Sequence, residues 1–403
     1  MEELFPAKQN ESKRSLNAKK KEFHTIAVLG SLPPLRALSS YCLEFTRAMV
    51  ELTEINFISF KKIYPAFLYP GGKLKEDSTF PSLTHHRLAV TRRLTWYNPA
   101  TWLREGFFSK ADLLHAQWWS LPLFPIYFLI CIGFKLRGKP VVLTVHNVHP
   151  HEKSGLFGLF SGLLFKLSDH VIVHSEKNRM QMIQHYAIPE EGVTAIPHGP
   201  LDFHTLNNVS REKARQETNM KPEEKVILLF GAIRPYKGID TAISAFDQVR
   251  KEIPEARLVI AGKLWGKWTP YAEMIKNRNL EQYIHTTLQY IPSEMVSFFF
   301  NAADLVILPY HHFDSQSGVG SIAVSFRKPM IVTNTGGLPD LVENPRNIVP
   351  PKDPDALARE IIRSLNTPGR LNEMKAEAEV VAEKIAWPAL AKKTLAVYKR
   401  ILE

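Results

Sequence analysis

The stretch VILLFGAIRPYKGIDTAISAFDQV, residues 226–249, contains the pattern that decides the fold. Val226–Phe230 is a continuous apolar run with the length of a buried strand, and the apolar positions of Ile239–Val249 recur with a helical period. A short loop with a glycine at each end joins the two segments. A buried strand that passes through a short loop into a helix is the repeating unit of a parallel α/β sheet.

The same alternation continues on both sides of this stretch. C-terminal to it, we predict strands at Arg257–Ile260, Leu305–Leu308 and Met330–Val332, and helices at Pro270–Lys276, Ser293–Ala302 and Gly318–Phe326. Before it, we predict a helix at Leu38–Leu52 and strands at Thr25–Leu29, Ile55–Phe60, Asp112–Ala116, Val141–Val145, His170–His174 and Val193–Ile196. A polar stretch without strand signal, Asn207–Lys225, separates the two rounds and is predicted as a linker with a surface helix. Two rounds predict an α/β protein with two Rossmann-like, doubly wound domains that face each other across a cleft.

Composition narrows the class of protein. Of the 403 residues, 45% are hydrophobic and 23% are charged, which is ordinary for a globular chain. Two cysteines, Cys42 and Cys131, are too few for a disulfide framework, and residues 1–22 are polar, with no secretory signal. We therefore predict a disordered tail at residues 1–22 and a cytoplasmic protein.

The longest apolar run, Leu121–Phe134, is too short to span a membrane, which takes roughly 18 to 20 residues. We predict a buried helix there, and shallow insertion into a membrane surface is the alternative. The net charge of +11 lies mainly in residues 1–200, with 24 Lys/Arg against 16 Asp/Glu, whereas the rest has 27 against 24. A basic N-terminal half suits a phosphate-bearing acceptor or an anionic membrane surface, although a solvated surface explains it equally well. No zinc-finger, helix-turn-helix or RNP pattern is present, so nucleic acid is not expected as a partner.

Candidate ligand-binding loops follow the strands of the second domain, where open α/β sheets bind ligands. The loop Gly231–Gly238 contains Arg234 and Lys237 just before a helix, and fixed cations beside a helix N-terminus suit a diphosphate. Two further glycine-containing loops, Asp314–Gly320 and Thr333–Asp340, also follow strands. Each loop alone is a weak signal, because two surface cations after a turn give the same pattern. Together the three loops predict an anion site.

These loops carry a resemblance to a known family. The segments FGAIRPYKGID (230–240), LVIAG (258–262), ADLVILPY (303–310) and SQSGVGSIAVSFRKPMIVTNTGGLPDLV (315–342) resemble the C-terminal domain of retaining glycosyltransferases of family 4, which have the GT-B fold. The first half is similar more loosely, through DLLHAQWW (112–119), VVLTVHNVHPHE (141–152), DHVIVHSE (169–176) and AIPHGP (195–200). The end of the chain, IAWPALAKKTLAVYKRIL (385–402), is similar to the family's terminal helix, which crosses back onto the N-terminal domain.

The resemblance implies a division of the chain and a reaction. An acceptor-binding domain would comprise residues 23–205, a nucleotide-sugar-binding domain residues 206–385, and the returning helix about 386–403. The protein would move a sugar from a UDP- or GDP-linked donor to a glycan or a lipid-phosphate-linked acceptor, with retention, in polysaccharide or glycoconjugate synthesis. It would work as a peripheral protein on the inner face of the membrane. Two rival functions are a nucleotide-sugar epimerase of the same fold and a non-catalytic relative that acts as a binding partner.

Site residues are implied by position. Arg234 and Lys237 would hold the donor diphosphate, Asp314 stands where the family has a glutamate near the sugar hydroxyls, and His146 would face the sugar and the acceptor. These four are the predicted catalytic residues. The predicted donor-binding set is Gly231, Arg234, Lys237, Ser317, Gly318, Val319 and Ile322. The predicted acceptor-binding set is Gly30, His115, Gln117, Trp118, His146 and Asn147. Trp118 and its neighbour Trp119 are aromatic residues that pack on sugar rings or, as often, fill a domain interface.

One departure from the family pattern affects the donor. Ile322 stands where the family has a second glutamate that binds the ribose hydroxyls, and isoleucine cannot make that contact. The nucleobase and the sugar therefore stay open. His146, His149, His151 and Glu152 could suggest a metal site, but Pro150 and the preceding strand indicate a loop, so we expect neither a metal nor another cofactor. The segment Lys61–Arg104 is predicted to be basic and irregular, and to lie over the acceptor side of the cleft.

Overall fold

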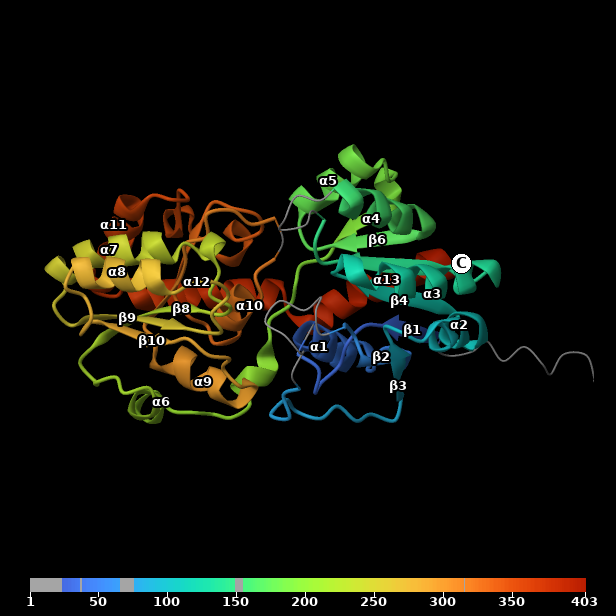
Figure 1. Ribbon diagram of the computed structural model, residues 1–403, viewed down its shortest axis with the longest axis horizontal. Helices are drawn as coiled ribbons and strands as arrows, with labels where there is room; N and C mark the ends of the chain where they lie inside the picture. Colours follow the sequence, from blue (N-terminus) through green and yellow to red (C-terminus); the bar gives the residue numbers. More distant parts are fainter. Residues whose placement is uncertain (1–23, 37, 66–75, 149–154, 315) are drawn as a thin grey trace, which may run out of the picture.

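The computed structural model describes residues 24–36, 38–65, 76–148, 155–314 and 316–403, so the predicted tail lies outside the described residues. The chain forms two lobes side by side, each built around a parallel sheet with helices on both faces (Figure 1). The prediction of two doubly wound α/β domains is therefore confirmed.

The N-terminal sheet has seven parallel strands in the order β3-β2-β1-β4-β5-β6-β7. Their bounds are β1 (Thr25–Leu29), β2 (Glu54–Lys62), β3 (Leu88–Thr95), β4 (Leu113–Trp118), β5 (Val141–Val145), β6 (His170–Val173) and β7 (Val193–Ala195). The strand order reverses between β1 and β4, which creates a crevice at the carboxyl ends of these strands.

Helices bury both faces of this sheet. Their bounds are α1 (Ser39–Met49), α2 (Pro99–Phe108), α3 (Phe124–Leu136), α4 (Gly155–Leu167) and α5 (Glu176–Tyr186), with short 3₁₀ turns η2 (Leu121–Leu123), η3 (Glu190–Gly192) and η4 (Asp202–Thr205). One face carries α2 to α5, and α1 covers the other. The predicted buried helix at Leu121–Phe134 is α3, preceded by η2, and its Ile126, Tyr127 and Ile130 lie in the core. Among the helices of the described residues, none combines the length and apolar character needed to cross a bilayer.

The prediction of an irregular segment at Lys61–Arg104 is wrong in part. This segment contains β3, which pairs in parallel with β2, and the beginning of α2. Because β3 is the edge strand and only its last two residues, Leu94 and Thr95, are buried, it lacks the continuous apolar run of an interior strand.

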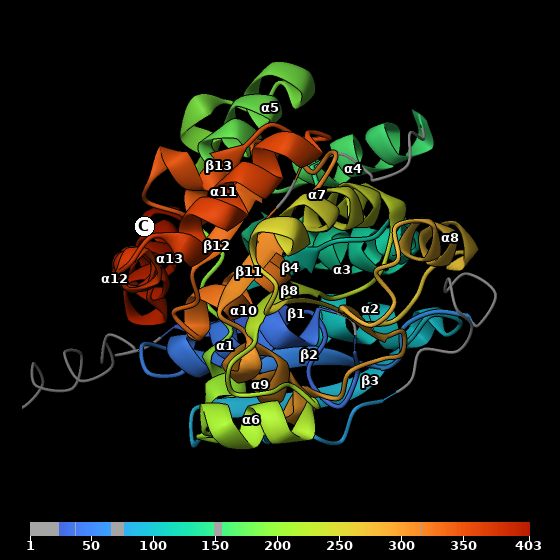
Figure 2. The same ribbon diagram turned by 90° about the vertical axis from the view of Figure 1, so that its left-hand side faces the viewer.

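The C-terminal sheet has six parallel strands in the order β10-β9-β8-β11-β12-β13. They are β8 (Lys225–Phe230), β9 (Ala256–Ala261), β10 (Ile284–Thr287), β11 (Leu305–Leu308), β12 (Met330–Thr333) and β13 (Ile348–Val349). The helices are α6 (Arg211–Glu217), α7 (Ile239–Glu252), α8 (Thr269–Asn277), α9 (Ser293–Ala302), α10 (Gly318–Ser325), α11 (Pro354–Asn366) and α12 (Arg370–Lys384), and the 3₁₀ turns are η5 (Pro235–Lys237), η6 (Pro339–Leu341) and η7 (Pro345–Asn347). Figure 2 shows α7 and α11 on one side of this sheet and α9 and α6 on the other.

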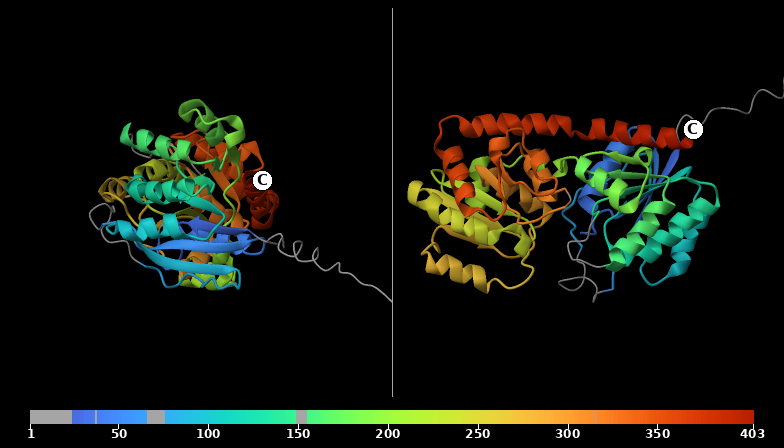
Figure 3. Two further views of the ribbon diagram at one scale, coloured as in Figure 1. Left: turned by 90° about the vertical axis from the view of Figure 1, so that its right-hand side faces the viewer. Right: turned by 90° about the horizontal axis from the view of Figure 1, so that it is seen from above.

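A final helix, α13 (Trp387–Leu402), connects the two lobes. It follows α12 and runs along the molecule onto the N-terminal domain (right view of Figure 3), where it packs against α1. Trp387 anchors its start, because its indole Nε1 donates to the carbonyl of Pro200 over 2.6 Å. A Cβ on Gly199 would lie 2.4 Å from the Trp387 ring, so only glycine leaves room for this contact.

Close packing of α2 on α3 gives a test of the fold. A Cβ on Gly133 of α3 would lie 2.6 Å from the Gly106 backbone of α2, so Gly133→Ala must push the helices apart. Overpacking of this kind costs about 1–3 kcal/mol, and we expect a lower midpoint of thermal unfolding. The control is Gly158→Ala in α4. Among the described residues, and apart from the backbone of the helix itself, no atom lies within 4 Å of the new Cβ, so this variant should leave the midpoint unchanged or raise it. Equal midpoints for the two variants would contradict the close packing of α2 on α3.

Candidate active site in the interdomain cleft

A cleft of about 650 Å³ lies between the two domains. Its walls come from residues at or just after the carboxyl ends of β5 and β6 on one side and of β8 and β11 on the other. The described residues that line it include the cations Arg36, Arg234 and Lys237 but no aspartate or glutamate. The lining therefore favours an anionic ligand.

Lys237 is the most deeply placed of these cations. Its side chain is only 5% exposed, and its Nζ donates to the hydroxyl of Tyr310 over 2.8 Å. Burial lowers the pKa of Lys237 from its ordinary value. Within the described part of the chain, no carboxylate lies at ion-pair distance from Lys237. An ammonium group with only neutral partners in a desolvated wall is ready to receive an anion.

Arg234 lies three residues before Lys237, at the start of the turn η5. Its guanidinium stacks on the ring of Trp265 at 4.1 Å, and its buried Nε has no partner among the described residues. Stacking fixes the plane of the guanidinium while leaving its edge available for hydrogen bonds. The predicted pair of cations after Phe230 does line the cleft.

The opposite edge of the anion site is the N-terminus of α10. Ser317 caps this helix, because its Oγ accepts from the backbone N–H of Gly320, and Gly318 and Val319 line the cleft. Free N–H groups and the helix dipole favour a negative charge here. Gly231 (φ 96°) permits the approach of the two loops, since a Cβ there would lie 2.7 Å from Val319 and 3.1 Å from Lys237 Nζ.

Ile322 lies one turn further along α10 and forms an apolar part of the cleft wall. It is 8% exposed and belongs to the same hydrophobic cluster as Leu201 and Phe230, which also line the cleft. With Ile322, every residue of the predicted donor-binding set lines the cleft. The apolar patch of Leu201, Phe230 and Ile322 offers no hydrogen-bonding side chain.

Asp314 is not among the described residues that line the cleft, although Phe313 and Gln316 are. Its backbone carbonyl accepts from Asn178 Nδ2 of the N-terminal domain over 2.8 Å, so this loop forms a bridge between the domains. The contact of its carboxylate with sugar hydroxyls stays a prediction. Nearby, Gln316 Nε2 donates to the backbone carbonyl of His174 and makes a second bridge.

His146 and Asn147 line the cleft on the side of the N-terminal domain, and their contact with an acceptor stays a prediction. His146 Nδ1 lies 3.1 Å from His174 Nε2, and its Nε2 lies 3.0 Å from the side-chain amide of Gln117. Burial, with a smaller effect of His174, lowers the pKa of His146 well below its ordinary value, so the ring is neutral. Both ring nitrogens are thus occupied by protein groups.

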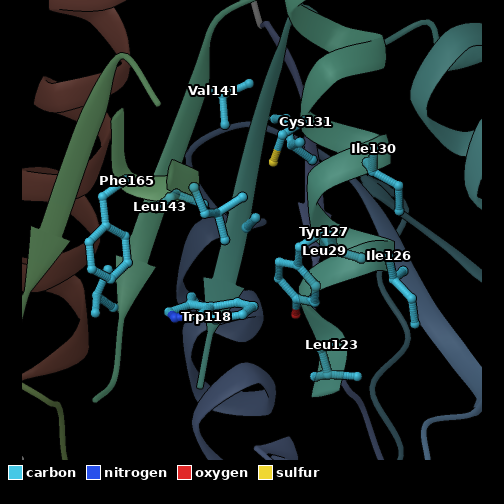
Figure 4. Packing of buried hydrophobic residues seen from close by; sticks show 14 of the residues in the cluster. Leu29, Trp118, Leu123, Ile126, Tyr127, Ile130, Cys131, Val141, Leu143 and Phe165 are labelled. Carbon is cyan, nitrogen blue, oxygen red and sulfur yellow. The ribbon is translucent and has the colours of Figure 1, made fainter. Parts of the chain in front are cut away.

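The prediction that His115, Gln117 and Trp118 contact the acceptor is wrong for this arrangement. All three side chains are completely buried, and none lines the cleft. Trp118 belongs to the core under α3, beside Tyr127 (Figure 4). Trp119, the first residue after β4, is the tryptophan that reaches the cleft, where its Nε1 donates to the hydroxyl of Tyr64.

Gly30 is also buried away from the cleft. A Cβ there would lie 3.0 Å from Cys42 Sγ and 3.3 Å from the Gln117 side chain, so glycine is needed for packing beneath the site. The residues that follow it, Leu32 to Pro34, line a separate cavity of about 240 Å³. The histidine-rich loop with His149, His151 and Glu152 lies outside the described residues. In the remainder, no group of three side chains is suited to hold a metal ion.

Sequence reasoning missed two further histidines of the cleft. His174 and His198 line it together with His146, and Tyr41 packs against all three rings at centroid distances of 4.6 to 5.4 Å. His198 Nδ1 also lies 3.0 Å from Ser321 Oγ of α10, across the domain boundary. A signal was present, because each of these histidines lies at or just after the end of a predicted strand, as His146 does.

Comparison with known proteins agrees with this geometry. The model of the family described as "Glycosyl transferases group 1" matches residues 210–381, and that of "Glycosyltransferase Family 4" matches residues 39–200. A D-inositol 3-phosphate glycosyltransferase of Segniliparus rotundus is 27% identical over 73% of this chain and 67% of its own length. Another of that name, from Thermobispora bispora, is 22% identical over 91% of this chain and 90% of its own length.

Solved structures show the same fold. HepE of Anabaena, in a crystal structure in complex with UDP, aligns with a TM-score of 0.69 at 15% identity, over 94% of this chain and 100% of that chain. Sucrose-phosphate synthase of Thermosynechococcus elongatus aligns with a TM-score of 0.67 at 16% identity, over 94% of this chain and 99% of that chain.

A substitution of Lys237 tests the anion site. Lys237→Met keeps most of the side-chain volume but removes the ammonium, so we expect the affinity for UDP or GDP, measured by calorimetric titration, to fall about 10- to 100-fold, as for the loss of a charge-assisted hydrogen bond. Lys251→Met is the control, because this lysine is 70% exposed and pairs with Asp247 on the surface of α7. Unchanged affinity in the Lys237 variant, with an unchanged unfolding midpoint, would exclude Lys237 as a phosphate ligand.

Proposed function

This chain belongs to family 4 of the glycosyltransferases and has their GT-B fold, and we propose that it transfers a hexose, with retention, from a UDP- or GDP-linked sugar to a glycan or a lipid-linked acceptor. The observation that carries the proposal is the pair of cations, Arg234 and Lys237, that face the cleft and have no carboxylate partner among the described residues. Opposite them lies the N-terminus of α10. A sugar nucleotide supplies a diphosphate of the right charge for this site.

Charge stabilisation is the main contribution of these residues to the reaction. When the bond between the anomeric carbon and the diphosphate oxygen breaks, negative charge grows on the leaving phosphate and positive charge on the sugar ring. Arg234, Lys237 and the N–H groups of Gly318 and Val319 are placed to stabilise the phosphate. Fixed donors of this kind commonly lower the activation barrier of an enzyme reaction more than any other single effect.

The chemistry of the lining argues against one of the two routes by which retention could occur. A double displacement needs a carboxylate nucleophile in the cleft, and the described lining residues contain none. In the proposed reaction, the acceptor oxygen attacks the anomeric carbon from the face that the phosphate leaves, and its proton passes to the departing phosphate oxygen. The configuration at the anomeric carbon is then kept.

Two observations support an anionic acceptor. Several of the relatives are named for inositol 3-phosphate, a phosphorylated polyol, and the cation Arg36 lines the N-terminal side of the cleft.

The helices α2 to α4 of the N-terminal domain expose large apolar side chains: Leu103, Phe108, Leu136, Leu159 and Leu163. Exposed lysines, Lys110 and Lys166, lie on the same helical layer. We include in the proposal that this layer rests on an anionic membrane surface, where a lipid-linked acceptor would be found.

The proposed reaction is tested with a panel of UDP- and GDP-linked sugars. We expect a stabilising thermal shift with one nucleotide and, with inositol phosphate or a polyprenyl-phosphate glycan as acceptor, a product whose anomeric configuration by NMR matches the donor. An isomerised donor in the absence of acceptor would instead indicate an epimerase. Absence of binding by every nucleotide sugar would indicate a non-catalytic partner.

Membrane attachment is tested by cosedimentation with vesicles. The double variant Leu159→Ser/Leu163→Ser should lower binding to vesicles that contain phosphatidylglycerol, because each leucine contributes about 1.5–3 kcal/mol when it is fully buried in an apolar phase. The matched control is Leu206→Ser, which removes a similarly exposed leucine outside the helical layer and should leave binding unchanged. Equal binding by all three proteins would remove the membrane surface from the proposal.

A further inference from the structure

A chain of buried polar side chains runs from the cleft to the C-terminal helix. It begins at His146, whose Nε2 lies 3.0 Å from the amide of Gln117. The other end of this amide lies 3.3 Å from His115 Nε2. His115 Nδ1 contacts the hydroxyl of Tyr398 in α13. Because α13 starts from the C-terminal domain, the chain links both domains to the cleft histidine.

On its other side, His146 is linked to a fixed acceptor. His146 Nδ1 lies 3.1 Å from His174 Nε2, and His174 Nδ1 lies 3.0 Å from the backbone carbonyl of Ile196. A carbonyl only accepts hydrogen bonds, so His174 must carry its proton on Nδ1. Burial lowers the pKa of His174 to about 3, so the ring is neutral and its Nε2 accepts.

Because His174 Nε2 is an acceptor, it determines which nitrogen of His146 carries the proton and how the Gln117 amide must be oriented. His146 Nδ1 must donate to His174, and the Nε2 of the neutral His146 ring is then an acceptor. The structure places Gln117 Oε1 next to that nitrogen and Gln117 Nε2 next to His115, so this order of protons requires the opposite orientation of the amide, with the amino group toward His146 and the carbonyl toward His115. The two ends of a glutamine amide have nearly the same shape, and their assignment follows from the hydrogen-bond network.

The same order of hydrogen-bond donors and acceptors continues to the hydroxyl of Tyr398. His115 Nε2 donates to the Gln117 carbonyl or to Thr144 Oγ1, which lies 2.6 Å away. Burial lowers the pKa of His115 to about 3, so this ring is also neutral and its Nδ1 accepts the proton of the Tyr398 hydroxyl. Each contact of the chain from Tyr398 to Ile196 can then pair a donor with an acceptor, as buried polar groups generally require.

We propose that Tyr398, His115 and Gln117 are positioning residues that hold His146 in its Nδ1–H tautomer and couple the docking of α13 to the geometry of the cleft. The T-shaped contact of Tyr41 with His146, at 4.6 Å, fixes the ring from the side of the cleft. With both nitrogens engaged, His146 presents a carbon edge to a ligand, and hydrogen bonding to a sugar requires it to leave Gln117 or His174. The effect on catalysis rests on the proposed function, whereas the tautomer does not.

The tautomer is measured by ¹⁵N NMR of the full-length protein labelled on histidine, because protonated and unprotonated ring nitrogens have well separated shifts. The His146 signals are assigned from their loss in His146→Asn. In the parent protein, Nδ1 of His146 should be protonated and Nε2 unprotonated. A protonated Nε2 with an unprotonated Nδ1 would overturn the proposal.

Two variants test the direction of the chain. Tyr398→Phe removes the terminal donor, so His115 should lose its single tautomer and the ¹⁵N shifts of His146 should change through Gln117, while His174 still accepts from His146 Nδ1. Gln117→Glu places an acceptor against His146 and should move the proton to Nε2. The control is Tyr127→Phe, because the Tyr127 hydroxyl is equally buried but donates to the backbone carbonyl of Gln117. Parent-like His146 signals in both Tyr398→Phe and Gln117→Glu would overturn the proposal.

Kinetics separate positioning from binding. With the donor and acceptor that give transfer, Tyr398→Phe should lower kcat about 3- to 10-fold, the size of one neutral hydrogen bond, and leave the donor KM within about twofold. Parent-like kcat would overturn the coupling to the cleft. If the parent protein transfers no sugar, the proposed function fails, while the NMR result still decides the tautomer.

Discussion

Lys237 holds a positive charge inside the protein with no carboxylate beside it among the described residues, and much of the cleft is organised by this constraint. A buried ammonium is costly unless an anion or several hydrogen-bond acceptors replace its water. Here the described surroundings offer the hydroxyl of Tyr310 and the turn that bears Arg234, and no carboxylate. The site is thus electrostatically incomplete on its own. Gly231 and the N-terminus of α10 leave space for an anionic partner beside these positive charges.

The cleft exists only while the two domains keep their relative position. Several contacts serve this purpose: Asn178 with the Asp314 carbonyl, His198 with Ser321, and Asp77 with Tyr290 and the N-terminus of α9. The longest link is α13, which is seated by Trp387 on the glycine at position 199 and reaches the chain of buried side chains through Tyr398. The cations on the C-terminal lobe and the histidines on the N-terminal lobe are therefore held in position by the same interdomain contacts.

Much of the fold was predictable because interior parallel strands are apolar on both faces. Val141–Val145 and Leu305–Leu308 have the predicted bounds, since every residue in them is buried. The strands that escaped prediction, β3, β10 and β13, form edges of the sheets or are very short, so solvent exposure removes the apolar signal. The position of the candidate anion site was predictable for a related reason, because three loops that follow strands of one sheet meet at its carboxyl edge.

The acceptor side was harder to predict, and the motif DLLHAQWW explains why. Its residues are close to the cleft, but Trp118 at the end of β4 lies in the core, whereas Trp119, just after the strand, reaches the cleft. His115 and Gln117 lie inside the domain, where their polar groups are satisfied by neighbours rather than by a ligand. A motif therefore marks the neighbourhood of a site, whereas the burial of each side chain separates residues that line the cleft from those that orient the residues that do. In this protein the second group connects the cleft to Tyr398, which lies 283 residues beyond His115 in the sequence.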